Sequence, residues 1–168
     1  MPRAKARRFI RINEPIIERD DIEAVTEVLE SGILTDKMGM GPYVTKFEQE
    51  FAKFVGTKYA IATNSGTSAL LAALSALGIK QGDEVILPSF AFVAAAEAVV
   101  WTGATPVFAD IDLSTYTIDP DSIKECITPN TKAIIVVHLY GMPADMDPIM
   151  EIAEEHGLYV IEDAAQAH

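Results

Sequence analysis

Two groups of polar residues in this sequence have types and spacing that could bind a ligand. Glu162 and Asp163 close an apolar run near the end of the chain, and Ser65, Gly66 and Thr67 follow an earlier one. A carboxylate at the wet end of a buried strand could hold a metal ion, a ribose hydroxyl or a protonated ring nitrogen. Free backbone amides at a helix start, hydroxyl donors and a glycine that permits close approach could bind an anion such as phosphate.

The residues alone leave alternatives open at both places. The stretch NSGTSAL also fits a Ser/Thr helix cap beside a turn glycine. A metal site is disfavoured, because Cys126, His138 and His156 show no ligand spacing. A phosphate site combined with a ring-nitrogen site fits pyridoxal phosphate, whose pyridine nitrogen an anionic partner keeps protonated.

A third candidate contact lies in the stretch LPSFAFVA. Phe90 and Phe92 would lie on the same side if the preceding strand continued, and one ring could stack on a flat ligand. From the residues alone the favoured interpretation is that both are core aromatics, as most phenylalanines are. The sequence has no Walker pattern and no G-x-G-x-x-G after a strand, so a nicotinamide-dependent enzyme is a weaker alternative.

Composition and charge restrict the classes of partner. The chain has 168 residues, of which 49% are hydrophobic, and a net charge of −12. This charge argues against nucleic acid and anionic membranes as partners. Cys126 is the single cysteine, and the sequence has no apolar run of membrane length and no signal-peptide pattern. We therefore expect a cytoplasmic protein in a reducing compartment.

Helical and strand patterns alternate along the chain. Helical spacing and end signals predict helices over 18–32, 41–56, 66–78, 91–103, 121–127 and 147–157. In the last of these, Asp147 and Pro148 resemble an N-cap and first-turn pair, and Gly157 a stop. Continuous apolar runs rich in Val and Ile predict strands over 58–63, 84–88, 105–110, 132–139 and 158–163.

This alternation predicts an α/β fold with a mainly parallel sheet and helices on both faces. We expect one domain, with a helical N-terminal segment over 1–56 and strand–helix alternation over 57–168. In such sheets ligands bind beyond the carboxyl ends of the strands. The polar groups described above follow such ends.

Five motifs, taken in order and spacing, carry a resemblance to a known family. NSGTSAL, LPSFAFVA, TPVFADID, VVHLYG-PADMD and VIEDAAQAH are similar to stretches of the DegT/DnrJ/EryC1/StrS family. Members of this family are fold-type I pyridoxal phosphate enzymes, mostly aminotransferases of nucleotide-linked keto sugars. The resemblance implies an incomplete fold-type I large domain and pyridoxal 5'-phosphate as the cofactor.

The resemblance also implies roles for particular residues. Ser65, Gly66 and Thr67 match the phosphate-binding turn, and Phe92 matches the aromatic residue that stacks on the cofactor ring. Asp163 matches the partner of the pyridine nitrogen. Gln166 matches a residue near the ring hydroxyl.

The sequence departs from the family in three respects. Ala91 stands where many relatives have threonine, and Met142 where many have glutamine. The lysine that forms the Schiff base in the family is expected beyond His168. The lysines present lie outside the recognised motifs: Lys5, Lys37, Lys46, Lys53, Lys58, Lys80, Lys124 and Lys132. The family fold also implies that strands from beyond His168 separate the strand before NSGTSAL from the one ending at Asp163.

The resemblance implies that the complete protein transfers an amino group, typically from glutamate, to a nucleotide-linked keto sugar. It also implies a homodimer. The 168-residue chain by itself is expected to be inactive. Two alternatives remain at this point: a sugar dehydratase of the same family with histidine in place of the lysine, and a non-catalytic fragment.

Overall fold

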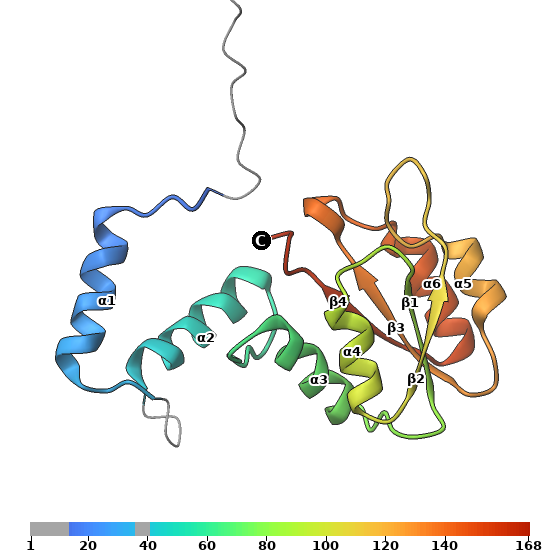
Figure 1. Ribbon diagram of the computed structural model, residues 1–168, viewed down its shortest axis with the longest axis horizontal. Coiled ribbons are helices and arrows are strands. Elements are labelled where there is room, and N and C mark those ends of the chain that lie inside the picture. The colour runs from blue at the N-terminus through green and yellow to red at the C-terminus, as the bar shows by residue number, and fades with distance from the viewer. Residues whose placement is uncertain (1–13, 36–40) are drawn as a thin grey trace, which may run out of the picture. The chain divides into compact units, whose positions relative to one another are not determined.

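The computed structural model describes residues 14–35 and 41–168 (Figure 1). Lys5 and Lys37 lie outside the described residues. The chain divides into two compact units, Met1–Ala62 and Thr63–His168. None of the described helices is long and apolar enough to cross a membrane.

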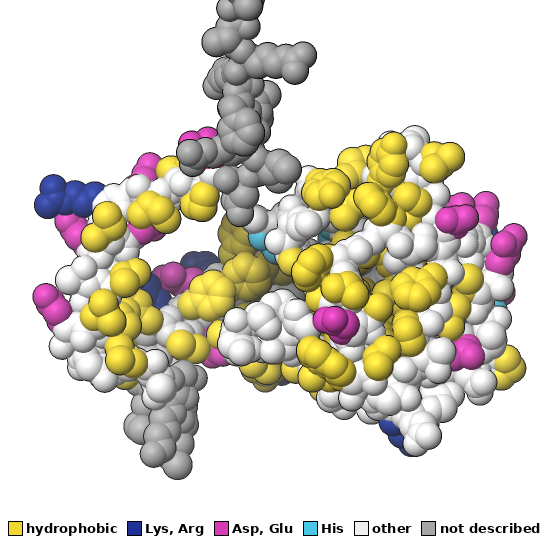
Figure 2. Space-filling model, in the orientation of Figure 1, with side chains coloured by type: hydrophobic (Ala, Val, Ile, Leu, Met, Phe, Trp, Pro, Cys, Tyr) yellow, Lys and Arg dark blue, Asp and Glu magenta, His cyan; other side chains and the backbone are white. Residues whose placement is uncertain are grey.

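The N-terminal unit contains the two predicted helices, α1 (Arg19–Ser31) and α2 (Pro42–Val55). Glycine in the left-handed conformation follows each of them, with φ of 68° at Gly32 and 82° at Gly56. The apolar stripes that predicted these helices are little covered within this unit: no residue of α1 is buried, and Ala52 is the buried residue of α2. Figure 2 shows apolar side chains on the surface of both helices.

One side-chain pair links the two helices of this unit. The hydroxyl of Tyr43 in α2 hydrogen-bonds to Glu27 in α1, and this bond raises the pKa of Tyr43 above its ordinary value. A hydrogen bond to a carboxylate favours the protonated hydroxyl, because ionisation would remove the donor and place two negative charges together.

The prediction of a strand over 58–63 was wrong for the described chain. This segment has no regular structure, and Tyr59 and Ile61 are exposed. A strand requires a hydrogen-bonded partner, and none of the strands in the described residues pairs with it. Instead the backbone N–H of Ala62 donates to the Glu48 carboxylate at 2.8 Å.

The other four predicted strands form one parallel sheet. They are β1 (Glu84–Pro88), β2 (Thr105–Ala109), β3 (Thr131–Val137) and β4 (Tyr159–Asp163), in the order β2-β1-β3-β4. The β3–β4 register pairs Ala133 with Tyr159 and Val137 with Asp163. The carboxyl ends of these two strands therefore meet at the same edge of the sheet.

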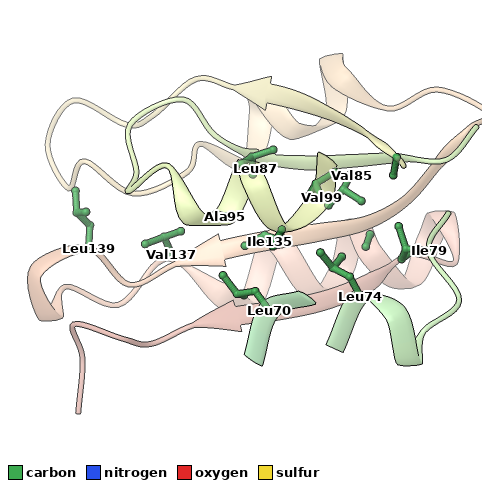
Figure 3. Close-up of a cluster of buried hydrophobic side chains, with 13 residues drawn as sticks. Leu70, Leu74, Ile79, Val85, Leu87, Ala95, Val99, Ile135, Val137 and Leu139 are labelled. Atoms are coloured by element: carbon green, nitrogen blue, oxygen red, sulfur yellow. The ribbon is translucent and has the colours of Figure 1, made fainter. Parts of the chain in front are cut away.

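Helices cover both faces of this sheet, as predicted (Figure 1). The first face packs against α3 (Gly66–Ala76) and α4 (Ala94–Trp101), and the second against α5 (Pro120–Cys126) and α6 (Met146–His156). Figure 3 shows the first core cluster, in which Leu70 and Leu74 of α3 lie near Ile135 of β3. Cys126 is half-buried and packs against the second cluster.

Two helix starts differ from the predictions. The N-cap of α6 is Asp145, so Asp147 and Pro148 both lie within the first turn. Proline is tolerated there because the first backbone N–H groups of a helix have no intrahelical partner. The N-cap of α5 is Asp119, whose side chain accepts from the N–H of Asp121. The predicted end of α6 is confirmed by Gly157, which has φ of 65°.

Candidate cofactor site

A cavity of about 210 Å³ lies at the carboxyl ends of the strands in the second unit. Its walls are formed by the start of α3, the segment after β1, and the ends of β3 and β4. The lining residues are Gly66, Thr67, Leu70, Phe92, Ala94, Val137, Leu139, Asp163, Ala165 and Gln166. The structure thus brings together five of the six predicted site residues, and Ser65 directly precedes the first of them.

The start of α3 confirms the helix cap predicted for the NSGTSAL stretch and places its next two residues beside the cavity. Ser65 is the N-cap, and its Oγ accepts from the backbone N–H of Ser68 at 3.1 Å. Gly66 and Thr67 line the cavity. A Cβ added at Gly66 would meet only the Cβ of Ala165, at 4.0 Å. The protein itself therefore leaves room for a side chain at Gly66, and the cavity side of the turn stays open to a ligand.

The two phenylalanines after β1 have different surroundings. The strand ends at Pro88, so strand alternation does not extend to Phe90 and Phe92. Phe92 lines the cavity and is 72% exposed, so it is not part of the core that the described residues form. Its ring is therefore available for stacking.

Phe90 instead packs against Tyr116, with ring centroids 6.2 Å apart. Tyr116 belongs to the loop between β2 and α5 and has a positive φ of 60°. Hydrogen bonds from Ser114 and Thr115 to the Asp112 carboxylate fold this loop, and they lower the pKa of Asp112. The loop thus supports Phe90 outside the cavity.

Asp163 ends β4 as a half-buried carboxylate in the cavity wall. Its Oδ1 accepts from the backbone N–H of Ala165 at 3.1 Å, which fixes the orientation of the carboxylate. Glu162 points elsewhere, because its Oε2 lies 2.8 Å from Nε2 of His138, which does not line the cavity. The two carboxylates thus point apart, as neighbouring side chains of a strand do.

Gln166 is tied to a turn that the sequence did not predict. Its Oε1 accepts from the backbone N–H of Tyr140 at 2.8 Å. Tyr140 lies in the short 3₁₀ turn η2 (Leu139–Gly141) with φ of 53°, so the predicted strand over 132–139 ends earlier, at Val137. Because this bond occupies the amide oxygen, the side-chain NH₂ of Gln166 is the group that can donate to a ligand.

Sequence reasoning missed the apolar wall of the cavity. Leu70, Val137 and Leu139 form it, and all three also belong to the first core cluster (Figure 3). A usable signal existed for Val137, because it lies near the end of the strand predicted over 132–139. In the structure this strand pairs with the one that ends in Asp163. Leu70 carried no such signal, since its helical spacing marks it only as a core residue.

The groups around the cavity fit pyridoxal phosphate. Helix-start N–H groups and a threonine hydroxyl suit the phosphate, Phe92 offers an aromatic face, and Asp163 offers a carboxylate for a ring nitrogen. None of the lysines in residues 14–35 and 41–168 lines the cavity. The described residues also contain no group of three side chains able to hold a metal ion.

Comparison with known proteins agrees with this chemistry. The model of the "DegT/DnrJ/EryC1/StrS aminotransferase family" matches residues 15–168. The chain belongs to this family. The family depends on pyridoxal phosphate, and the parallel sheet with its helices is part of the large domain of fold-type I aminotransferases.

Three relatives illustrate the similarity. The spore coat polysaccharide biosynthesis protein SpsC of Bacillus subtilis is 50% identical over 97% of this chain and 41% of its own length. GDP-perosamine synthase of Caulobacter vibrioides is 45% identical over 94% of this chain and 42% of its own. The structure of NtdA from Bacillus subtilis, with bound cofactor PMP, has a TM-score of 0.82 and 45% identity, over 89% of this chain and 34% of NtdA.

The chain therefore spans roughly two fifths of the length of the family members that it matches. This is consistent with the expectation that the family's lysine belongs to a segment outside the present sequence.

Proposed function

We propose that the complete protein is a pyridoxal phosphate-dependent aminotransferase that acts on a nucleotide-linked keto sugar. The single observation that supports this most is that Asp163, Phe92, Gly66 and Thr67 line one cavity. These residues are far apart in sequence, and each offers the group that a different part of the cofactor requires. The family match over residues 15–168 supports the same reaction class.

Within this proposal each residue of the site has a defined task. Gly66 and Thr67, at the start of α3, receive the phosphate through N–H groups and a hydroxyl, aided by the positive end of the helix. Phe92 stacks on the ring. Asp163 holds a proton on the ring nitrogen, and Gln166 donates its NH₂ to the ring hydroxyl. The bound cofactor supplies the electron sink for moving the amine.

Substrates and assembly extend the proposal. A nucleotide-linked keto sugar is supported by the relative named GDP-perosamine synthase. Glutamate as the amino donor, a homodimeric assembly, a cytoplasmic location and a Schiff-base lysine beyond His168 follow from the family resemblance. Neither nucleic acid nor a membrane is a proposed partner, given the net charge of −12.

The test is an amino-transfer assay on the purified complete protein. The protein is supplied with pyridoxal phosphate, glutamate and a GDP-linked keto sugar, and the sugar product is analysed by mass spectrometry. We expect an amino sugar together with 2-oxoglutarate. Loss of the sugar hydroxyl without gain of nitrogen would instead identify the dehydratase alternative.

Gly66→Ala separates ligand binding from helix capping. The added Cβ meets only Ala165, at an ordinary 4.0 Å, so the fold should tolerate it. Alanine also favours the helical conformation over glycine by about 0.5–1 kcal/mol. We therefore expect an equal or higher melting temperature but weaker binding of pyridoxal phosphate. Ser75→Ala, at the exposed far end of α3, is the matched control. Unchanged cofactor affinity in Gly66→Ala would show that the ligand does not approach this glycine.

Phe92→Ala tests the stacking contact. Because the side chain is 72% exposed, its loss should leave stability nearly unchanged. Stacking of this kind contributes about 0.5–1.5 kcal/mol beyond area burial, so the Kd for the cofactor should rise by roughly 2- to 13-fold. Added cofactor should restore much of the activity. Phe90→Ala, outside the cavity, serves as the control, and equal affinities in the two variants would refute the assignment.

A further inference from the structure

His138 is a buried histidine that the proposed function does not use. It follows β3 directly and is 7% exposed. Its Nδ1 accepts from the backbone N–H of Ala144 at 3.1 Å, and its Nε2 lies 2.8 Å from Oε2 of Glu162. A backbone N–H can only donate, so Nδ1 carries the lone pair and the ring hydrogen is on Nε2, which donates to the carboxylate. Both ring nitrogens therefore have fixed partners.

These bonds join two segments that carry cavity residues. The backbone N–H of His138 also donates to the carbonyl oxygen of Asp163 at 3.1 Å, one step beyond the last β3–β4 pair. The bond to Ala144 closes the turn over 139–144 from one side. The bond from Tyr140 to Gln166 holds the same turn from the other side.

The turn needs such support because its backbone is strained. Tyr140 has φ of 53°, in the left-handed region that non-glycine residues rarely adopt. Strain of this kind persists only where the surroundings fix it. Leu139, in the same turn, forms part of the cavity wall. If the turn relaxed, both the wall and the position of Gln166 would change.

We propose that His138 is a positioning residue of the cofactor site. Its side chain does not line the cavity. Its ring contacts Ala144 in the turn over 139–144 and Glu162 at the end of β4, so that Leu139, Asp163 and Gln166 keep their places. The part of this inference that concerns cofactor affinity rests on the proposed function.

Two substitutions separate the two ring contacts. In His138→Asn the amide oxygen lies where Nδ1 was and can still accept from Ala144. In His138→Gln the amide reaches the Nε2 position near Glu162, and the acceptor for Ala144 is lost. Both variants are neutral and polar, so they share the cost of removing the ring. His156→Asn, at the exposed end of α6, is the control for histidine replacement.

The experiment measures two quantities on the complete protein. Hydrogen exchange followed by mass spectrometry, without cofactor, reports on peptides that cover 139–144 and 164–167. Titration with pyridoxal phosphate gives the Kd. For His138→Gln we expect faster exchange in both peptides. We also expect a Kd about tenfold higher, because one buried hydrogen bond is lost. For His138→Asn we expect near-normal exchange and a Kd within about threefold of the wild-type value.

A purely structural histidine would give a different pattern. Both variants would lower the melting temperature alike and leave exchange in the two peptides and the Kd unchanged, which would overturn the proposal. Equal losses of affinity in Asn and Gln would also overturn it, since the Ala144 contact would then be irrelevant. If the wild-type protein bound no pyridoxal phosphate, the proposed function would fail. The exchange data would still decide whether His138 holds the turn.

Discussion

Asp163→Asn should remove most amino-transfer activity from the complete protein while leaving its fold intact. Asparagine has nearly the same shape, and its Oδ1 can still accept from the Ala165 N–H, as the aspartate does at 3.1 Å. What it lacks is the negative charge. A neutral amide does not keep the ring nitrogen protonated, so the cofactor becomes a poorer electron sink. We expect a loss in kcat on the order of 10²-fold or more, as for other carboxylates that hold a ring in its reactive protonation state.

The measurements are kcat, kcat/KM and the absorbance spectrum of the bound cofactor. Circular dichroism shows whether the fold is retained. Glu151→Gln, an exposed carboxylate on α6, controls for the change in net charge. Near-normal turnover by Asp163→Asn with a full complement of cofactor would show that the carboxylate has another role. An unfolded variant would show that its bond to Ala165 is not reproduced by the amide.

The sheet of this protein was largely predictable, because its strands are continuous apolar runs covered on both faces. The strand Glu84–Pro88 forms at the predicted residues. Val85 and Ile86, neighbours in this strand, are both fully buried, each in a different core cluster. Such a pattern leaves few alternatives to a central parallel strand.

The strand predicted over 58–63 shows where this reasoning stops. An apolar run of the correct length specifies what a segment could form, but pairing requires a second strand at the correct place. No strand in the described residues is there, and Ile61 is 83% exposed. Pairing is a property of the whole sheet, so a local pattern does not determine it.

The polar half of the site was predictable and the turn behind it was not. Gly66 and Asp163 were found because each lies where an apolar run ends, which is where α/β sheets bind ligands. The turn at Tyr140 has a backbone conformation that no sequence rule assigns to tyrosine. His138 belongs to the VVHLYG motif, but the sequence did not indicate its partners Ala144 and Glu162, which come together only in the folded sheet.

The largest expected effect on stability is at Ile134, in the middle of β3. Ile134 is fully buried, and its strand pairs on one side with Ile86 and on the other with Val160. Its side chain belongs to the core cluster that α5 and α6 cover. Truncation to alanine should leave a cavity that this close-packed layer cannot fill, and should lower the free energy of unfolding by about 2–5 kcal/mol.

Chemical denaturation of the complete protein measures this loss. Lys132→Ala changes an exposed side chain on the same strand and should stay within about 0.5 kcal/mol of the wild-type value. Ile134 faces away from the first core cluster, which contains Ile135 and Val137 and borders the cavity. The folded fraction of Ile134→Ala should therefore bind pyridoxal phosphate normally. A loss of stability below about 1 kcal/mol would mean that the core under α5 and α6 repacks into the cavity left by Ile134. Weakened cofactor binding by the folded variant would show instead that the two faces of the sheet are coupled through β3.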